Sequence, residues 1–238
     1  MVSFNISSVV IGFCFISNSN PCTTKDRDWE TVDSVDAILL DGSNDNILTR
    51  QVYFGADYFS EGLGSSTTWY EKWDDMANND GGFTVQGWFR SFNSTSWSNY
   101  TNFFSAYMND GFRLRTNNSN GSVHFASIQS LSYAQGAYTP SPSVIVGPGA
   151  WHMITFIYDK SNTQWHLYVD DTLEHTRTNT GIGFDSWVAG SMVIGAYRTS
   201  GTEAKKFYVG GYKMYNTVLT SQEVADNYDA EKSNYGIT

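Results

Sequence analysis

The side chains that could do chemistry in this sequence are carboxylates and histidines, and their spacing matches no catalytic site. A retaining glycosidase needs two carboxyl groups about 5–5.5 Å apart, which one strand can supply as Glu-x-Asp-x-x-Glu. The chain has no such run, and its densest acidic segment, residues 26–33, is typical of a solvated polar linker. The histidines are dispersed, at His124, His152, His166 and His175. We therefore predict a protein that is not an enzyme and has no catalytic residues.

Oxygen-bearing side chains gather in one short segment of the sequence. Asp41, Asn44 and Asp45 offer carboxylate and amide oxygens, which suit the flexible coordination of calcium. The alternative, which we favour, is that these residues form a turn and bond their own backbone. Calcium is thus the one cofactor that the sequence suggests, and both interpretations stay open.

Aromatic residues beside amides are the other candidates, because a ring can stack on a sugar while its neighbours bind the hydroxyl groups. The polar segment 91–102 carries Trp97 and Tyr100 together with Asn93 and Asn99. We predict a glycan-binding site there, since segments that join strands often carry function. The alternative for Trp97 is that its ring folds onto the core.

Elements that could position these residues follow from short runs with period-two alternation, separated by clusters of Gly, Asn, Asp and Ser. This pattern predicts an all-β fold with two antiparallel sheets packed as a sandwich, rather than alternating βα units. The expected strands include residues 83–90, 102–108, 112–115, 122–128, 151–159, 164–170, 172–176, 191–196 and 207–215.

One or two short helices interrupt the strands. Thr68 and Thr220 each begin a Thr-x-x-Glu capping box. In the first helix Trp69 and Trp73 share one face, which favours core packing over ligand binding. We expect the second helix to dock beneath the sandwich, and we expect an N-terminal extension over residues 1–35 before a single domain over residues 36–238.

Four segments occur in a recognisable order. They are an apolar strand followed by Asp-Gly (residues 37–46), a Phe-Thr strand with a following Trp (83–89), a hairpin (151–159 and 167–171), and a closing strand and helix (194–196, 209–216 and 219–224). The set resembles the laminin G-like, concanavalin A-like lectin-glucanase superfamily, which implies a jelly roll. Asp171 stands where this family usually has Gly, and Asp tolerates the positive φ of such a turn. The resemblance implies no activity, because the family includes lectins, glycan-cleaving enzymes, adhesion modules and virus structural parts.

The charge balance excludes some partners. The chain has 238 residues with 14 Lys+Arg against 24 Asp+Glu, a net charge of −10 at pH 7. Nucleic acids and anionic membrane surfaces both require clustered basic residues, so we expect neither as a partner. No stretch of the sequence is long enough for a membrane span.

The N-terminal segment has the length of a signal-peptide apolar region, but its first basic residue is Lys25, so it lacks the positive region of such a signal. A signal peptide is the less favoured alternative. We predict a docking arm that adds a strand to a neighbouring subunit; alternatively, it completes the domain's own sheet. The arm residues are Phe4, Val9, Val10, Ile11, Phe13, Phe15 and Ile16. Whether Cys14 and Cys22 pair is left open.

Together these features predict a non-enzymatic structural and interaction protein with a lectin-like domain. An apolar arm without an export signal favours an exterior component of a virus or phage particle, such as a decoration, capsid or tail-associated protein. Its partners would be other proteins of the assembly, including further copies of the chain, and a surface glycan. The alternative is a secreted carbohydrate-binding module or adhesin.

Overall fold

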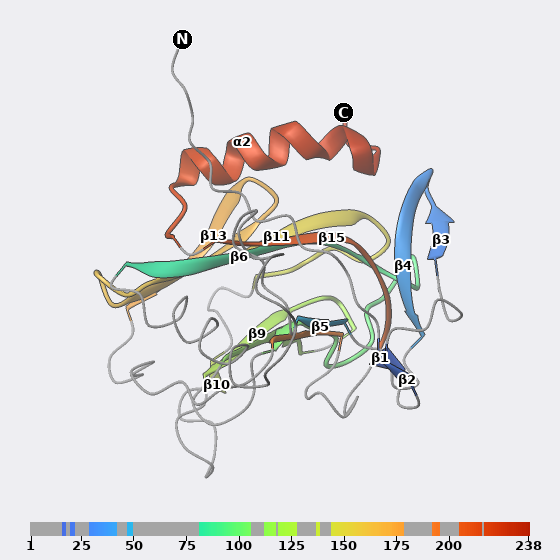
Figure 1. The fold of residues 1–238 in the computed structure, drawn as a ribbon, viewed down its shortest axis with the longest axis horizontal. Coiled ribbons are helices and arrows are strands. Elements are labelled where there is room, and N and C mark those ends of the chain that lie inside the picture. Colours follow the sequence, from blue (N-terminus) through green and yellow to red (C-terminus); the bar gives the residue numbers. More distant parts are fainter. Residues whose placement is uncertain are drawn as a thin grey trace.

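Two antiparallel sheets pack face to face in the computed structural model, and a C-terminal helix lies on the outer side of one of them (Figure 1). The structure describes residues 16–17, 20–21, 29–41, 47–49, 81–105, 112–117, 119–127, 137–138, 144–178, 192–195, 205–215 and 217–238. Across these residues, no helix has both the length and the hydrophobicity needed to cross a bilayer. The predicted all-β sandwich is confirmed.

The larger sheet has seven strands within the described residues. From edge to edge they are β13 (Thr172–Thr178), β12 (Gln164–Val169), β11 (Trp151–Asp159), β6 (Gly82–Ser91), β15 (Lys206–Tyr215), β4 (Val35–Asp41) and β3 (Trp29–Val32). The facing sheet has six, in the order β10 (Ala137–Tyr138), β9 (Val123–Ser127), β8 (Phe112–Thr116), β7 (Asn102–Ser105), β14 (Met192–Ile194) and β5 (Ile47–Thr49). A separate pair joins β1 (Ile16–Ser17) to β2 (Asn20–Pro21).

Strand β6 lies inside the larger sheet, between β11 and β15, and both of its faces are buried. Phe83, Val85 and Phe89 belong to the core between the sheets. Phe89 packs against aromatic rings of β7 and β15, with its ring centroid 5.1 Å from that of Phe103. Trp88 points to the opposite side, into a second apolar cluster. The predicted alternation is confirmed, and the C-terminal helix explains why neither face is open to solvent.

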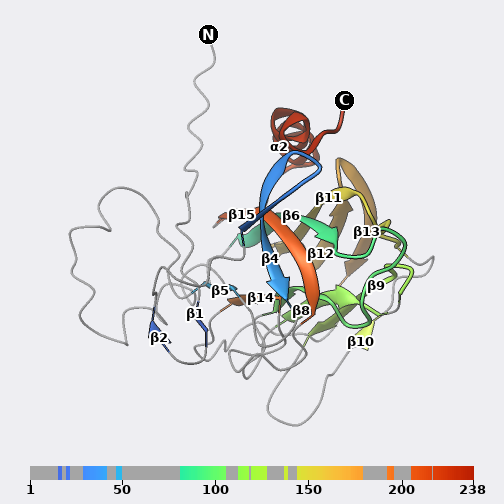
Figure 2. The same cartoon turned by 90° about the vertical axis from the view of Figure 1, so that its right-hand side faces the viewer.

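That helix, α2 (Ser221–Glu231), begins at the predicted capping box. The Thr220 hydroxyl accepts from Glu223 N, and the Glu223 carboxylate accepts from Thr220 N. A 3₁₀ turn, η2 (Lys232–Tyr235), continues the chain. Figures 1 and 2 show α2 on the side of the larger sheet away from the facing sheet, which confirms that it docks on the sandwich. The helix expected after Thr68, with Trp69 and Trp73, lies outside the described residues.

The larger sheet begins earlier in the sequence than the predicted domain boundary. Strand β3 pairs with β4 from Trp29↔Ile38 to Val32↔Val35. Asp33 and Ser34 form the turn with φ values of 51° and 66°, and two positive φ angles are what a two-residue hairpin turn of type I′ requires. Part of the segment taken as a linker is therefore a strand of the domain.

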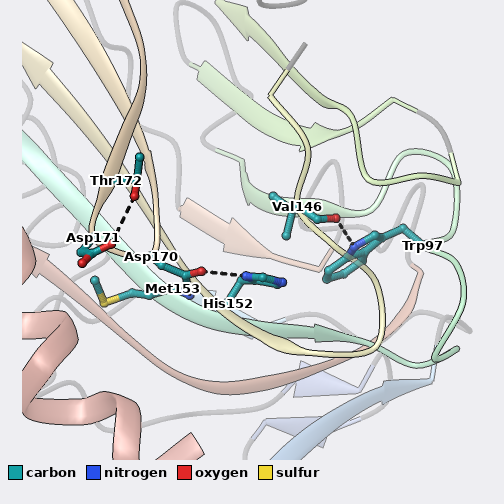
Figure 3. Close-up of polar contacts among 7 residues, drawn as sticks. All are labelled: Trp97, Val146, His152, Met153, Asp170, Asp171 and Thr172. Atoms are coloured by element: carbon teal, nitrogen blue, oxygen red, sulfur yellow. Dashed lines mark hydrogen bonds and ion pairs between the residues drawn. The ribbon is translucent and has the colours of Figure 1, made fainter. Parts of the chain in front are cut away.

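In the hairpin between β12 and β13, the residue with a positive φ differs from the one expected. The positive φ of 59° belongs to Asp170 and not to Asp171. The Asp170 carboxylate accepts a hydrogen bond from Met153 N at 2.9 Å and lies 2.9 Å from Nδ1 of His152 (Figure 3). These contacts tie the turn to β11, which gives Asp170 a structural role.

The C-terminal turn η2 is held by ring stacking on Trp88. The Tyr235 ring stacks on Trp88 with centroids 4.1 Å apart, and Trp88 Nε1 donates to Glu231 at 2.7 Å. Tyr235 also fills the space over Gly210, where an added Cβ would lie 2.3 Å from the ring. Gly210 is the extra residue of a bulge in β15, so the absence of a side chain lets the two segments approach.

We predict that Gly210→Ala displaces η2 and lowers the free energy of unfolding by about 1–3 kcal/mol, because the new methyl group overpacks the contact. Gly211→Ala is the matched control, since its nearest neighbour, the Tyr235 hydroxyl, is at an ordinary contact distance of 3.4 Å. Urea unfolding followed by tryptophan fluorescence measures both. Equal stability of the two variants would contradict this account of the bulge.

Candidate ligand-binding loop

The loop of residues 92–101 joins β6 to β7, and its middle is anchored in the core by Trp97. This ring is only 2% exposed and packs edge-on against Phe103, with centroids 5.2 Å apart. Its Nε1 donates to the carbonyl oxygen of Val146 at 2.9 Å (Figure 3). Gly121 lies so close that an added Cβ would be 2.9 Å from the ring. The prediction that Trp97 stacks on a glycan is wrong, and the alternative of core packing is correct for this residue.

The end of the loop is fixed by buried hydroxyl groups. Thr101 and Thr116 are fully buried. Both of their hydroxyls donate to the carbonyl oxygen of Ser98, at 2.9 and 3.0 Å. Thr101 N donates in turn to the Thr116 hydroxyl at 3.0 Å. This network places the residues between Ser98 and Thr101 on a rigid base.

Tyr100 stands on that base with an exposed ring. Its backbone has a φ of 64°, a left-handed conformation that is unfavourable for a bulky side chain, and its residue exposure is 41%. The Arg115 guanidinium carbon, on neighbouring β8, lies 4.2 Å from the ring centroid. Such a stacked pair contributes about 0.5–1 kcal/mol at an exposed site. The surroundings thus hold an aromatic ring outward in a strained conformation.

The amides around the ring differ in their roles. Asn102 is buried and donates from Nδ2 to the Tyr100 carbonyl oxygen at 3.1 Å, while its Oδ1 has no hydrogen-bond partner within the described residues. Asn99, the residue before Tyr100, is exposed. Asn93 instead accepts from Thr95 N and from the Thr95 hydroxyl, so its side-chain oxygen stabilises the local turn.

The beginning of the same loop presents a second exposed ring. Phe92 is 44% exposed, and the Lys206 ammonium nitrogen lies 3.8 Å from its ring centroid. The Tyr208 ring flanks Phe92 at a centroid distance of 5.8 Å. Arg90 lies over Tyr208 and pairs with Asp33, with Arg90 Nε 2.8 Å from the carboxylate. An aromatic ring with a cation over it therefore occurs at both ends of the loop.

Three residues of the candidate site were missed from the sequence. Arg115 alternates with Phe112 and Leu114, which is a usable signal, but its contact with Tyr100 depends on the β7–β8 register and on the bulge at Phe103. Phe92 and Lys206 meet only because β15 pairs with the end of β6. The local sequence around either residue does not predict that contact.

The other predicted sites lie largely outside the described residues. Asp41 ends β4, its side chain is not described, and Asn44 and Asp45 lie outside. Within the described ranges, no three His, Cys, Asp or Glu residues are grouped to hold a metal ion. Of the predicted docking arm, Ile16 pairs with Pro21, and its other members are outside the described residues: Phe4, Val9, Val10, Ile11, Phe13 and Phe15.

We predict that Trp97→Ala lowers the free energy of unfolding by about 3–5 kcal/mol, because it removes a buried ring and its hydrogen bond. Tyr100→Gly is expected to change stability by no more than about 1 kcal/mol, since glycine adopts the positive φ freely and offsets the lost ring contact. Denaturant unfolding of the two variants measures the difference. A comparable loss in Tyr100→Gly would mean that Tyr100 is itself a structural anchor.

The fold resembles several solved binding domains. The receptor-binding domain of botulinum neurotoxin mosaic serotype C/D superposes with a TM-score of 0.57 at 13% identity, covering 94% of this chain and 51% of that one. The serotype D binding domain gives 0.56 at 13% identity, with 94% and 52% covered. The chain thus spans about half the length of these toxin domains.

Domain 4 of AbnA, an extracellular arabinanase from Geobacillus stearothermophilus solved in complex with arabinotriose, is similar over more of its own length. Its TM-score is 0.54 at 18% identity, with 83% of this chain and 79% of that one covered. No curated protein sequence matches the chain. A family model does match, over residues 63–225, which is more than half of the sequence. With its two facing antiparallel sheets, the chain belongs to the concanavalin A-like lectin/glucanases superfamily.

Proposed function

We propose that the chain is a non-catalytic carbohydrate-binding domain whose ligand contacts the 92–101 loop at Tyr100. The observation that carries this proposal is an exposed tyrosine ring in a left-handed backbone conformation, mounted on buried anchors. Strain of this kind persists only where the surroundings impose it, and it is concentrated at functional sites. The ring's position is thus better explained by ligand binding than by stability.

The chemistry around the ring suits a sugar. One side of the Tyr100 ring is covered by Arg115, and its remaining surface can stack on the apolar face of a pyranose or furanose. The Arg115 guanidinium and the Asn99 amide provide donors for hydroxyl oxygens. The similar arabinanase domain was solved with a bound arabinose oligosaccharide, which supports a saccharide as the ligand class.

The histidine–carboxylate contact in the structure has a structural explanation. The carboxylate of Asp170 is shared between His152 Nδ1 and the backbone N–H of Met153. Asp170 also holds the left-handed position of its hairpin turn. These contacts give His152 and Asp170 a structural role.

The localisation of the domain stays a prediction. An exterior position on a virus or phage particle, with the N-terminal arm as the anchor, rests on the sequence pattern of that arm. A secreted module remains the alternative, and glycan binding through the loop is compatible with both.

We predict that Tyr100→Ala lowers the affinity for a glycan identified on a broad array by about tenfold or more, since stacked aromatic residues dominate such interfaces. Tyr100→Phe should retain most of the affinity, because it keeps the ring. Leu173→Ala is the control, since Leu173 is similarly exposed but lies on β13. Isothermal titration calorimetry measures all three. A wild-type protein that binds nothing on the array would contradict the proposal.

A further inference from the structure

The Phe92 end of the loop has a different chemistry from the Tyr100 end. Phe92 has no polar group, yet 44% of the residue is exposed. Lys206, the first residue of β15, reaches over the ring with its ammonium nitrogen 3.8 Å from the centroid. The contact with the ring holds the lysine side chain in place, and it uses no acceptor oxygen. The ammonium therefore keeps N–H donors for another group.

The charges near this ammonium leave it able to attract an anion. Arg90 pairs with Asp33, so that carboxylate is already engaged. Among the residues whose side chains the structure describes, Lys206 forms no ion pair at 4 Å or less. Asp41 is opposite Lys206 in the backbone register, and its side chain is not described.

We infer that Phe92 and Lys206 form a second subsite on the loop, which binds the carboxylate of an acidic sugar residue. The inference rests on the proposed glycan-binding function and specifies its ligand as an oligosaccharide that contains uronic or sialic acid. The Phe92 ring contacts the sugar's apolar surface, and the Lys206 ammonium donates a charge-assisted hydrogen bond to the carboxylate. A methyl ester removes the negative charge and leaves the rest of the sugar unchanged.

The test is binding to a panel in which each acidic oligosaccharide is paired with its methyl ester. We expect at least one acid to bind about tenfold more tightly than its ester, with an affinity that falls as salt is raised. Lys206→Gln should remove that difference, because the cation that distinguishes the acid from its ester is lost. Lys206→Arg should retain it, because the cation and its donors remain.

Lys205→Gln is the matched control, because it removes the same charge from the neighbouring residue. Lys206, and not Lys205, is the lysine found over the Phe92 ring. Because salt weakens the effect of a charge that makes no direct contact, this variant should lose no more than about twofold in affinity. Equal losses in the two glutamine variants, or no acid that binds better than its ester, would overturn the inference. Ester binding that is lost in Tyr100→Ala would still support the proposed function, so the two failures are distinguishable.

Discussion

The burial of β6 on both of its faces is the constraint on which the rest of the structure depends. One face supplies phenylalanine rings to the core between the sheets, and the other places Trp88 under α2 and η2. The side chains of a strand point alternately to its two faces. A shift of one residue in the pairing of β6 would therefore turn the core-facing side chains toward α2 and the others toward the core. The register with β11 and β15 is thus specified from both sides at once.

The same constraint bears on the location of the proposed ligand site. With α2 and η2 packed on the outer face of the larger sheet, the Trp88 side of that face is occupied by the protein's own tyrosine rings. The loop that leaves β6 begins at the end of this rigid strand, and Trp97 pins its middle to Val146. Exposed rings on such a loop lose little conformational freedom on binding, which favours affinity.

Local patterns predicted much of the fold, because alternation and capping boxes act within a few residues. The bounds expected for β11 match the structure, and the helix after Thr220 begins where its capping box indicated. The early start of the larger sheet was missed because a strand that begins in an acidic segment shows little apolar alternation. Trp97 was ambiguous for a related reason: its loop is polar, while its partners Gly121 and Val146 come from distant segments.

The cations over the exposed rings also bear on the form of the ligand. Arg115 and Lys206 come from different sheets and reach rings at opposite ends of one loop, with buried Trp97 between those ends along the chain. Each ring remains partly exposed beside its cation. A sugar residue that stacks on one ring uses its apolar face for that contact. Engagement of both ends therefore favours an oligosaccharide, and the anchored loop would set the spacing between the sugar residues that it contacts.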